Sequence, residues 1–204
     1  MRIRSALVLV AVAALTLAAR SQDYFLIDQQ SADESSPTES GSPLGLGTRM
    51  LQSFTPAFSS IDFVRLKLAT AVGGPGLPAY VDVRLWSAWP SGRQLAMTEL
   101  ETIPDGFDGY VVFRFQTPVP LTPGTTYFIN ANRQGEQEVF WASDSRLGYP
   151  GGMGYSGGTA RPQWDFWFQE GIVVPEPTTT ALLFVGLGAL GAARWFRRKG
   201  QRGA

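Results

Sequence analysis

The sequence predicts an all-β central domain, an antiparallel sandwich of two sheets, between two apolar chain ends. Three observations lead to this fold class. Short stretches of the 204-residue chain alternate apolar and polar residues with a period of two. Clusters of Gly and Pro separate these stretches, as turns do. No window of ten or more residues outside the chain ends has a helical period, which argues against the crossover helices of a parallel sheet.

The chain begins with the layout of a secretory signal peptide. Arg2 and Arg4 precede an apolar run over residues 6–19. A charged segment before such a run is typical of secretory signals, so we expect delivery by the Sec translocon. We expect a signal helix within residues 1–21 that is cleaved after Ser21 or two residues earlier. An uncleaved N-terminal anchor is the alternative.

Residues 22–173 are predicted to form the sandwich. Apolar and charged residues alternate regularly at Val81, Val83 and Leu85, so we expect one face of this strand to be buried and the other to be exposed to solvent. Eight or nine short strands in one domain of this size indicate two antiparallel sheets. In chain order, with the weaker candidates included, the expected strands are 24–28, 49–54, 64–68, 81–85, 94–100, 111–116, 127–130, 138–142 and 164–168.

Loose motifs in this domain resemble the galactose-binding-like and related jelly-roll domains of exported bacterial proteins. The motifs are Gln-Ser-Phe-Thr-Pro at 52–56, Gly92 before a strand, and Leu-Thr-Pro-Gly-Thr-Thr-Tyr at 121–127. The resemblance implies a jelly roll. An immunoglobulin-like sandwich is the alternative with a similar number of strands.

Two segments lack strand character. Residues 31–43 are rich in Ser, Pro, Glu and Asp and cannot bury enough apolar surface, so we expect a disordered, solvated loop there. Residues 148–158 hold six glycines and two tyrosines, which predicts a flexible aromatic loop. This loop lacks the Gly-Lys-Ser/Thr ending of a phosphate-binding loop.

Composition excludes several classes of function. The chain has no Cys and no His. It therefore has no disulfide, no zinc site of the usual ligand type and no Ser-His-Asp triad. Residues 22–173 hold 9 basic and 16 acidic side chains, a net charge of −7. An acidic domain does not suit a nucleic-acid partner, because phosphate binding needs clustered Lys and Arg.

A Pro-Glu-Pro motif, an apolar stretch and a basic tail follow one another at the end of the sequence. Pro175, Glu176 and Pro177 form the motif, and residues 181–193 carry no charge. The basic residues after the stretch are Arg194, Arg197, Arg198, Lys199 and Arg202. This order resembles the PEP-CTERM sorting signal of exported bacterial proteins, which is sometimes labelled by its occurrence in ice-binding proteins. The resemblance implies that an exosortase-type processing enzyme reads the three parts together and cuts near the motif.

The tail also has the physical properties of a membrane anchor. A helix over residues 178–196 is roughly 28 Å long, close to the ~30 Å hydrocarbon core of a bilayer. Basic residues on its C-terminal side place that end in the cytoplasm. We therefore expect a sorting signal at 174–204 with one transmembrane helix at 179–196, held in the inner membrane until processing releases the protein to the cell surface or the medium. An anchor that is never processed is the alternative.

Aromatic residues provide the best binding hypothesis for the central domain. Flat rings beside polar groups can hold a sugar. The candidate glycan-binding residues are Trp86, Trp167, Tyr149 and Tyr155. Trp164 is expected to be buried, because it shares a strand face with two phenylalanines, whereas Trp167 should point outwards.

We expect no catalytic residues and no cofactor. Paired carboxylates are what a glycoside hydrolase needs, but acidic residues that alternate on strands and turns usually form a solvated face. Two of them, Asp105 and Asp108, flank Gly106 and could contribute to a structural Ca²⁺ site. The six carboxylates in question are Glu99, Glu101, Asp105, Asp108, Glu136 and Glu138.

The sequence thus predicts a non-enzymatic exported protein of the cell surface or extracellular matrix. A lectin-like module that binds carbohydrate or exopolysaccharide is the alternative, and a glycoside hydrolase is a third hypothesis. No regular Thr-x-Thr ladder is present, so we do not expect the domain to bind ice.

Overall fold

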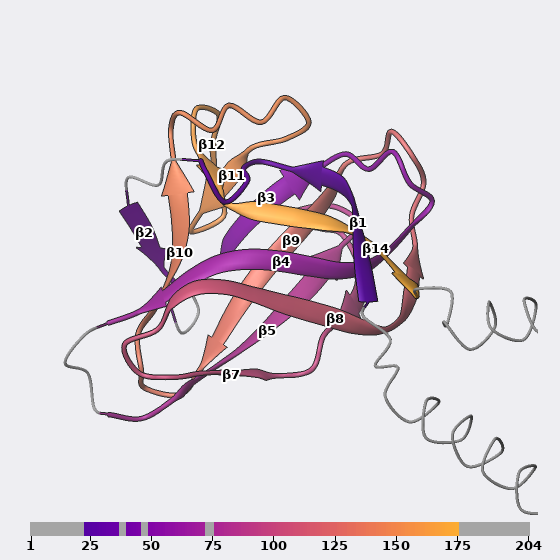
Figure 1. Cartoon of the computed structure of the whole chain (residues 1–204). Coiled ribbons are helices and arrows are strands. Elements are labelled where there is room, and N and C mark those ends of the chain that lie inside the picture. The colour runs from indigo at the N-terminus through magenta and orange to yellow at the C-terminus, as the bar shows by residue number, and fades with distance from the viewer. Residues whose placement is uncertain (1–22, 37–39, 46–48, 72–75, 176–204) are drawn as a thin grey trace, which may run out of the picture. The chain divides into compact units, whose positions relative to one another are not determined.

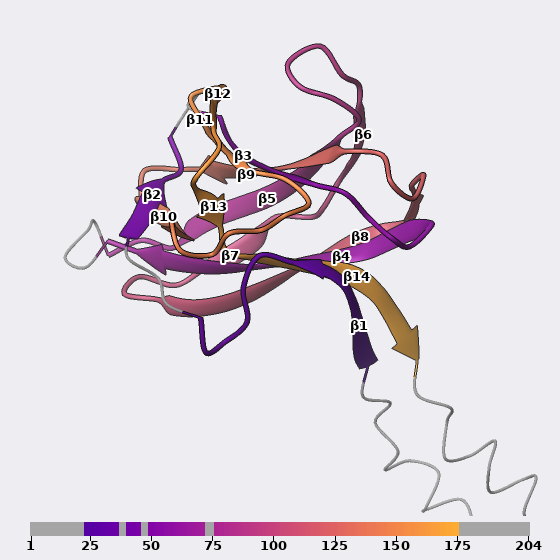
Figure 2. The same ribbon diagram turned by 90° about the horizontal axis from the view of Figure 1, so that it is seen from above.

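Two antiparallel β-sheets pack face to face in the computed structural model of the chain (Figures 1 and 2). The structure describes residues 23–36, 40–45, 49–71 and 76–175. The predicted signal helix and the predicted transmembrane helix therefore lie outside the described residues. In the part that is described, no helix has the length and apolar character needed to cross a membrane. The all-β, two-sheet fold class is confirmed.

The first sheet has the order β1-β14-β4-β10-β13, with β8 paired to β4 and β2 paired to β10. Its strands are β1 (Asp23–Gln30), β2 (Ser40–Pro43), β4 (Ser60–Thr70), β8 (Asp108–Pro120), β10 (Val139–Asp144), β13 (Asp165–Phe166) and β14 (Phe168–Pro175).

The second sheet has the order β12-β11-β3-β9-β5-β6, with β7 paired to β5. Its strands are β3 (Met50–Phe54), β5 (Ala79–Trp86), β6 (Gln94–Met97), β7 (Glu101–Ile103), β9 (Tyr127–Gln134), β11 (Gly154–Ser156) and β12 (Thr159–Arg161). Figure 2 shows the two sheets as two layers.

The core lies between the two sheets and follows from the alternation in the sequence. In β4 every second residue from Val64 to Leu68 is fully buried, while Arg65 and Lys67 between them face outwards. Full burial of one such side chain contributes about 1.5–3 kcal/mol. The large side chains of this core include Phe54, Leu66, Leu68, Phe113, Trp141, Phe166 and Phe168.

All nine expected strands are present, and the structure adds several short ones. The additional strands are β2, β7, β11 and β12, each of three or four residues. The expected strand at 164–168 is interrupted at Trp167, which separates β13 from β14. The jelly-roll connectivity stays a prediction.

The expectation of a disordered loop at 31–43 is wrong in its last part. Ser40–Pro43 form β2, whose four residues pair with Phe140–Ser143 of β10. A strand of Ser, Gly and Pro residues is held by backbone pairing with its neighbour, which composition alone does not reveal.

The glycine-rich segment at 148–158 is also more ordered than expected, because its glycines permit close contact with β3. A Cβ atom on Gly152 would clash with the carbonyl oxygen of Ser53. The Met153 amide donates to Ser53 Oγ (2.8 Å), and the Ser53 amide donates to the Met153 carbonyl (2.9 Å). Gly154–Ser156 then pair with β3 as β11.

A buried side-chain bridge joins the two sheets. Gln52 of β3 donates from Nε2 to Asp165 Oδ1 (2.9 Å) and accepts from the Phe166 amide (2.8 Å). Asp165 Oδ2 accepts from the Tyr149 amide (2.8 Å), which fixes the start of the glycine-rich segment. Burial raises the pKa of Asp165. Removal of any partner would leave buried polar groups unpaired.

The first and last strands of the domain lie side by side. The Ser31 amide donates to the Phe168 carbonyl (3.1 Å), while further along β14 a Cβ on Gly171 would clash with the Leu26 carbonyl. Early residues of β1 thus meet late residues of β14, so the two strands run antiparallel. Glycine at position 171 is required for this close approach.

Glu170 of β14 is a fully buried carboxyl group. Burial, together with the charge of nearby Asp28, raises its pKa to about 9. Neither carboxyl oxygen of Glu170 has a hydrogen-bond partner among the described residues. Asp28 Oδ2 instead accepts from the amides of Ala57 and Phe58, both at 2.8 Å. Glu170 is therefore protonated at neutral pH.

Stability should fall as the pH rises. The folded-state pKa of Glu170 is above its unfolded value of 4.5, so ionisation opposes folding between pH 4.5 and about 9. We expect the free energy of unfolding to fall across this window by at most about 1.4 kcal/mol per pH unit. Glu170→Gln should remove most of the slope, with the smaller remainder from Asp165. Urea denaturation of the full chain in detergent micelles measures this, with exposed Glu138→Gln as the control. An equal slope in both variants would contradict the assignment.

Candidate functional site

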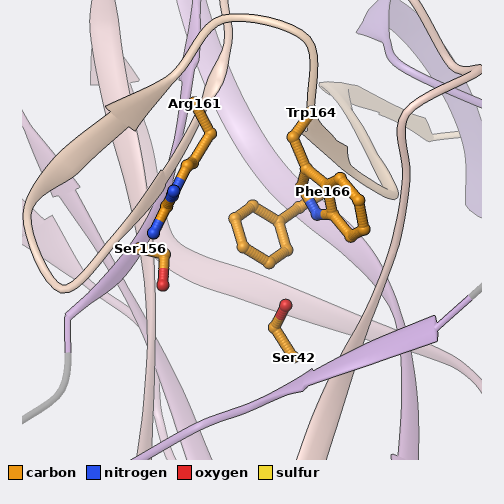
Figure 3. Close-up of a pocket in the computed structure, with 5 residues that line it drawn as sticks. All are labelled: Ser42, Ser156, Arg161, Trp164 and Phe166. Carbon is orange, nitrogen blue, oxygen red and sulfur yellow. The ribbon is translucent and has the colours of Figure 1, made fainter.

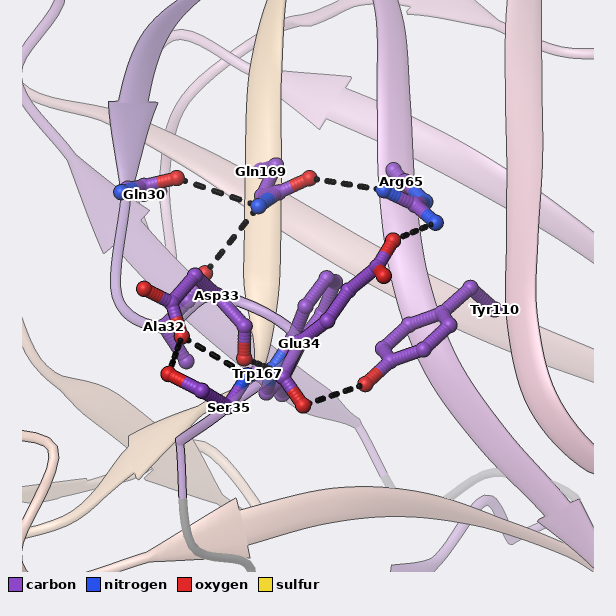
Figure 4. A network of polar contacts seen from close by, with 9 residues as sticks. All are labelled: Gln30, Ala32, Asp33, Glu34, Ser35, Arg65, Tyr110, Trp167 and Gln169. Carbon is purple, nitrogen blue, oxygen red and sulfur yellow. Dashed lines mark hydrogen bonds and ion pairs between the residues drawn. The ribbon is translucent and has the colours of Figure 1, made fainter.

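The structure does not bring the four candidate glycan-binding residues together. Trp167 is fully buried, so the expectation that it points outwards is wrong. It lies on the outer face of the first sheet, but residues 32–36 fold over it (Figure 4). Its Nε1 donates to the Asp33 carbonyl (3.0 Å), and its ring lies 4.7 Å from that of Tyr110.

The segment over Trp167 is fixed by further polar contacts. Glu34 Oε1 pairs with Arg65 Nη2 at 2.6 Å, and the Arg65 guanidinium lies 4.7 Å from the centre of the Tyr110 ring (Figure 4). Tyr110 Oη donates to the Glu34 carbonyl (3.3 Å). Hydrogen bonds from Ser35 lower the pKa of Asp33, which accepts them in a local turn. The composition of this segment gave no sign that it covers an aromatic ring.

Tyr149 is a core residue rather than a surface one. It is 7% exposed, and its ring packs edge to face on Phe168 at 5.2 Å. Its hydroxyl donates to Gln29 Oε1 (2.9 Å). Burial raises the pKa of Tyr149 to about 12. The residue thus anchors the glycine-rich segment from inside.

Trp86 and Tyr155 do share a surface, the outer face of the second sheet. Phe128 lies between them, as the cross-strand partner of Trp86 and with its ring 5.5 Å from that of Tyr155. Trp89 stands edge to face against Trp86 at 5.9 Å, and the Arg49 guanidinium lies 4.8 Å from the centre of the Trp89 ring. These rings pack largely on one another, so they form a cluster rather than an open platform.

An open cleft lies elsewhere, around Arg161 and Trp164. Two adjoining pockets, of about 270 and 420 Å³, share these two residues in their linings. A space of this size accommodates one or two sugar rings. We call it the Arg161–Trp164 cleft; its other lining residues are Ser42, Ser145, Ser156, Pro162, Gln163 and Phe166.

A short turn after β12 positions the two principal residues. The Trp164 amide donates to the Arg161 carbonyl (3.0 Å), and the Trp164 carbonyl accepts from the Gly154 amide (2.7 Å). Trp164 is half-buried, so the expectation that it lies in the core is wrong: it belongs to the turn and not to a strand. Figure 3 shows the Arg161 side chain pointing towards Ser156, with the rings of Phe166 and Trp164 across the pocket.

One pattern in the sequence marks this cleft. Arg161-Pro162-Gln163-Trp164 places a cation and an indole three residues apart around a proline, directly before a strand. Ser42 and Ser156 gave no signal, because they come from segments that were expected to be loops.

The six acidic residues considered for hydrolysis lie apart from the cleft. They are exposed or half-exposed, and none appears among the described residues that line it. Glu99 Oε1 accepts from Gln116 (3.0 Å) and Asp105 Oδ1 from Gln137 (3.1 Å). No three acidic residues of the described chain are grouped so that they could hold a metal ion. The calcium site stays an untested prediction.

The sorting motif begins where the described chain ends. Pro175 is the last residue of β14. The other candidate sorting residues, Glu176, Pro177, Arg194, Arg197 and Arg198, lie outside the described residues. Residues 173–199 match the PEP-CTERM protein-sorting motif, which confirms the resemblance seen in the sequence. No curated protein matches the chain. The motif identifies an exported protein that is sorted by an exosortase-type enzyme and anchored through its C-terminus.

Replacement of Trp167, which residues 32–36 cover, should lower the stability of the domain. We expect Trp167→Ala to lower the free energy of unfolding by about 3–5 kcal/mol, since it leaves a cavity under residues 32–36 and an unpaired carbonyl. Trp164→Ala, in the open cleft, is the matched control and should cost less than about 1 kcal/mol. Urea denaturation of the full chain measures both. Equal costs would mean that Trp167 is not the more deeply packed residue.

Proposed function

We propose that the protein is a non-enzymatic component of the cell surface or extracellular matrix, delivered across the membrane, held by its C-terminal tail and released by an exosortase-type enzyme. The match of residues 173–199 to the sorting motif carries this proposal. The central fold supports it, because an acidic sandwich suits a soluble domain outside the cytoplasm.

The junction between the sandwich and the motif supports processing at the edge of the folded domain. The matched span begins at residue 173, inside β14, so no linker separates the fold from the motif. Pairing of β14 with β4 ends at Gly171. Beyond that point the Val173 amide donates to Asp62 Oδ2 (3.0 Å). Local opening after Gly171 would break the bond to Asp62 and the pairing with β1, and it would free the residues before Pro175 while β14 stays paired with β4.

Carbohydrate binding is the second candidate function, and the Arg161–Trp164 cleft is the observation that favours it. The cleft joins an aromatic ring to hydroxyl and guanidinium groups in a space of the right size for a sugar. Glycoside hydrolysis is the weaker hypothesis, because no carboxylate is among the described lining residues. A flat melting temperature across a range of polysaccharides would reject the binding function.

Loss of the motif should abolish processing. In cells that contain the processing enzyme, replacement of Pro175, Glu176 and Pro177 by alanine should leave the tail attached and the protein in the inner membrane. The native product should end near residue 177 by mass spectrometry. Recovery of the wild-type protein with Ala204 intact would refute processing and leave only an anchor.

A linker at the junction should accelerate processing. If cleavage waits for local opening of β14, six Gly and Ser residues inserted between Val173 and Val174 should increase the rate of tail removal about tenfold, because the inserted residues separate the motif from the strand that is paired with β1 and bonded to Asp62. Pulse-chase labelling measures the rate. The same insertion in the exposed turn at 90–92 is the control. A rate that is unchanged by the junction insertion would show that opening of the strand is not limiting.

A further inference from the structure

Arg161 differs from almost every other cation of the described chain. Most cationic side chains are engaged, as Arg65 is with Glu34 or Arg49 with the Trp89 ring. Among the described residues, the side chains of Arg93 and Arg161 alone make no hydrogen bond, ion pair or ring contact. Of these two, only Arg161 lines a cleft.

The surroundings of Arg161 leave its charge uncompensated. The described residues that line the cleft include no Asp or Glu. Two buried acids, which face each other across the pairing of β10 with β13, are engaged elsewhere. Asp144 makes a bidentate pair with Arg146 (2.7 and 2.9 Å), and Asp165 accepts from Gln52 and the Tyr149 amide. The cleft thus carries one positive charge in a domain whose net charge is −7.

The other lining groups match a sugar ring. The indole of Trp164 is half-buried, so one part of the ring is supported and another faces the open space. The hydroxyls of Ser42 and Ser156, together with the amide of Gln163, supply donors and acceptors. A guanidinium provides a fork of N–H donors that fits a carboxylate or a sulfate in a bidentate manner.

We propose that the Arg161–Trp164 cleft binds an anionic sugar residue of an extracellular polysaccharide. Arg161 pairs with the acidic group, Trp164 packs against the C–H face of the ring, and Ser42 and Ser156 bind hydroxyls. This proposal rests on the carbohydrate-binding function suggested above and adds the chemical class of its ligand. The shared requirement is a negative charge on the sugar, whether carboxylate or sulfate.

Calorimetric titration of the full chain in detergent micelles tests the proposal. The probes are short oligomers of galacturonate, glucuronate and mannuronate, each compared with its methyl ester, which has the same rings without the charge. A sulfated galactan oligomer forms a further arm. We expect at least one acid to bind about tenfold or more tightly than its ester, with an affinity that falls as salt is added. The sulfated oligomer tells a carboxylate-specific site from a general anionic one.

Variants separate the roles of the side chains. Arg161→Gln should weaken binding of the acid about tenfold and leave binding of the ester unchanged, whereas Trp164→Ala should weaken both. Arg93→Gln, at the other unpaired cation, should change neither by more than about twofold. Melting temperatures close to that of the wild type confirm that the variants fold.

Two results would overturn the proposal in distinguishable ways. If acid and ester bind equally and Arg161→Gln has no effect, the cleft is a neutral sugar site and carbohydrate binding stands without the anionic ligand. If no oligomer binds to the wild-type chain at millimolar concentration, both the anionic ligand and the carbohydrate-binding function are rejected.

Discussion

The side-chain bridge of Gln52, Asp165 and Tyr149 is the constraint on which most of the described site depends. It joins β3 of one sheet to β13 of the other and holds the start of the glycine-rich segment in the same contact. Hydrophobic burial between sheets is non-directional and would tolerate several arrangements of this segment. A buried carboxylate that needs two specific donors tolerates far fewer. The bridge therefore fixes the frame from which the turn with Arg161 and Trp164 projects.

The sequence predicted the regular part of the fold because the long strands face apolar core on one side and solvent on the other. Apolar and polar residues therefore alternate with a period of two along β4, β5 and β8. It fails for the short strands: β2 and β11 consist of Ser, Gly, Pro and Tyr residues and exist because a neighbouring backbone pairs with them. The local sequence does not indicate such pairing, so it predicts loops for these segments.

The same limit explains the errors at the candidate site. Alternation along the strand predicts that Trp167 points to the face opposite Trp164 and is exposed there, yet an acidic segment from a distant part of the chain covers it. Trp164 was expected to be buried because its strand was assumed to run unbroken. The cover over Trp167 depends on a contact between residues more than 100 positions apart, and Trp164 is placed by a turn that interrupts the strand. Periodicity carries no information on either. The sorting tail, by contrast, is a linear signal, and the sequence sufficed to recognise it.

Because β1 pairs with β14, the first sheet can be completed only after the last strand of the domain has been synthesised. The bond between Phe168 and Ser31 spans 137 positions, so the first strand to emerge from the translocon must wait for the last before its own sheet can close. During that wait, the edge of the incomplete sheet is open to aggregation. Anchoring through the C-terminus would hold the newly exported domain at the membrane while this sheet closes. Release after closure would deliver a finished sandwich rather than a folding intermediate.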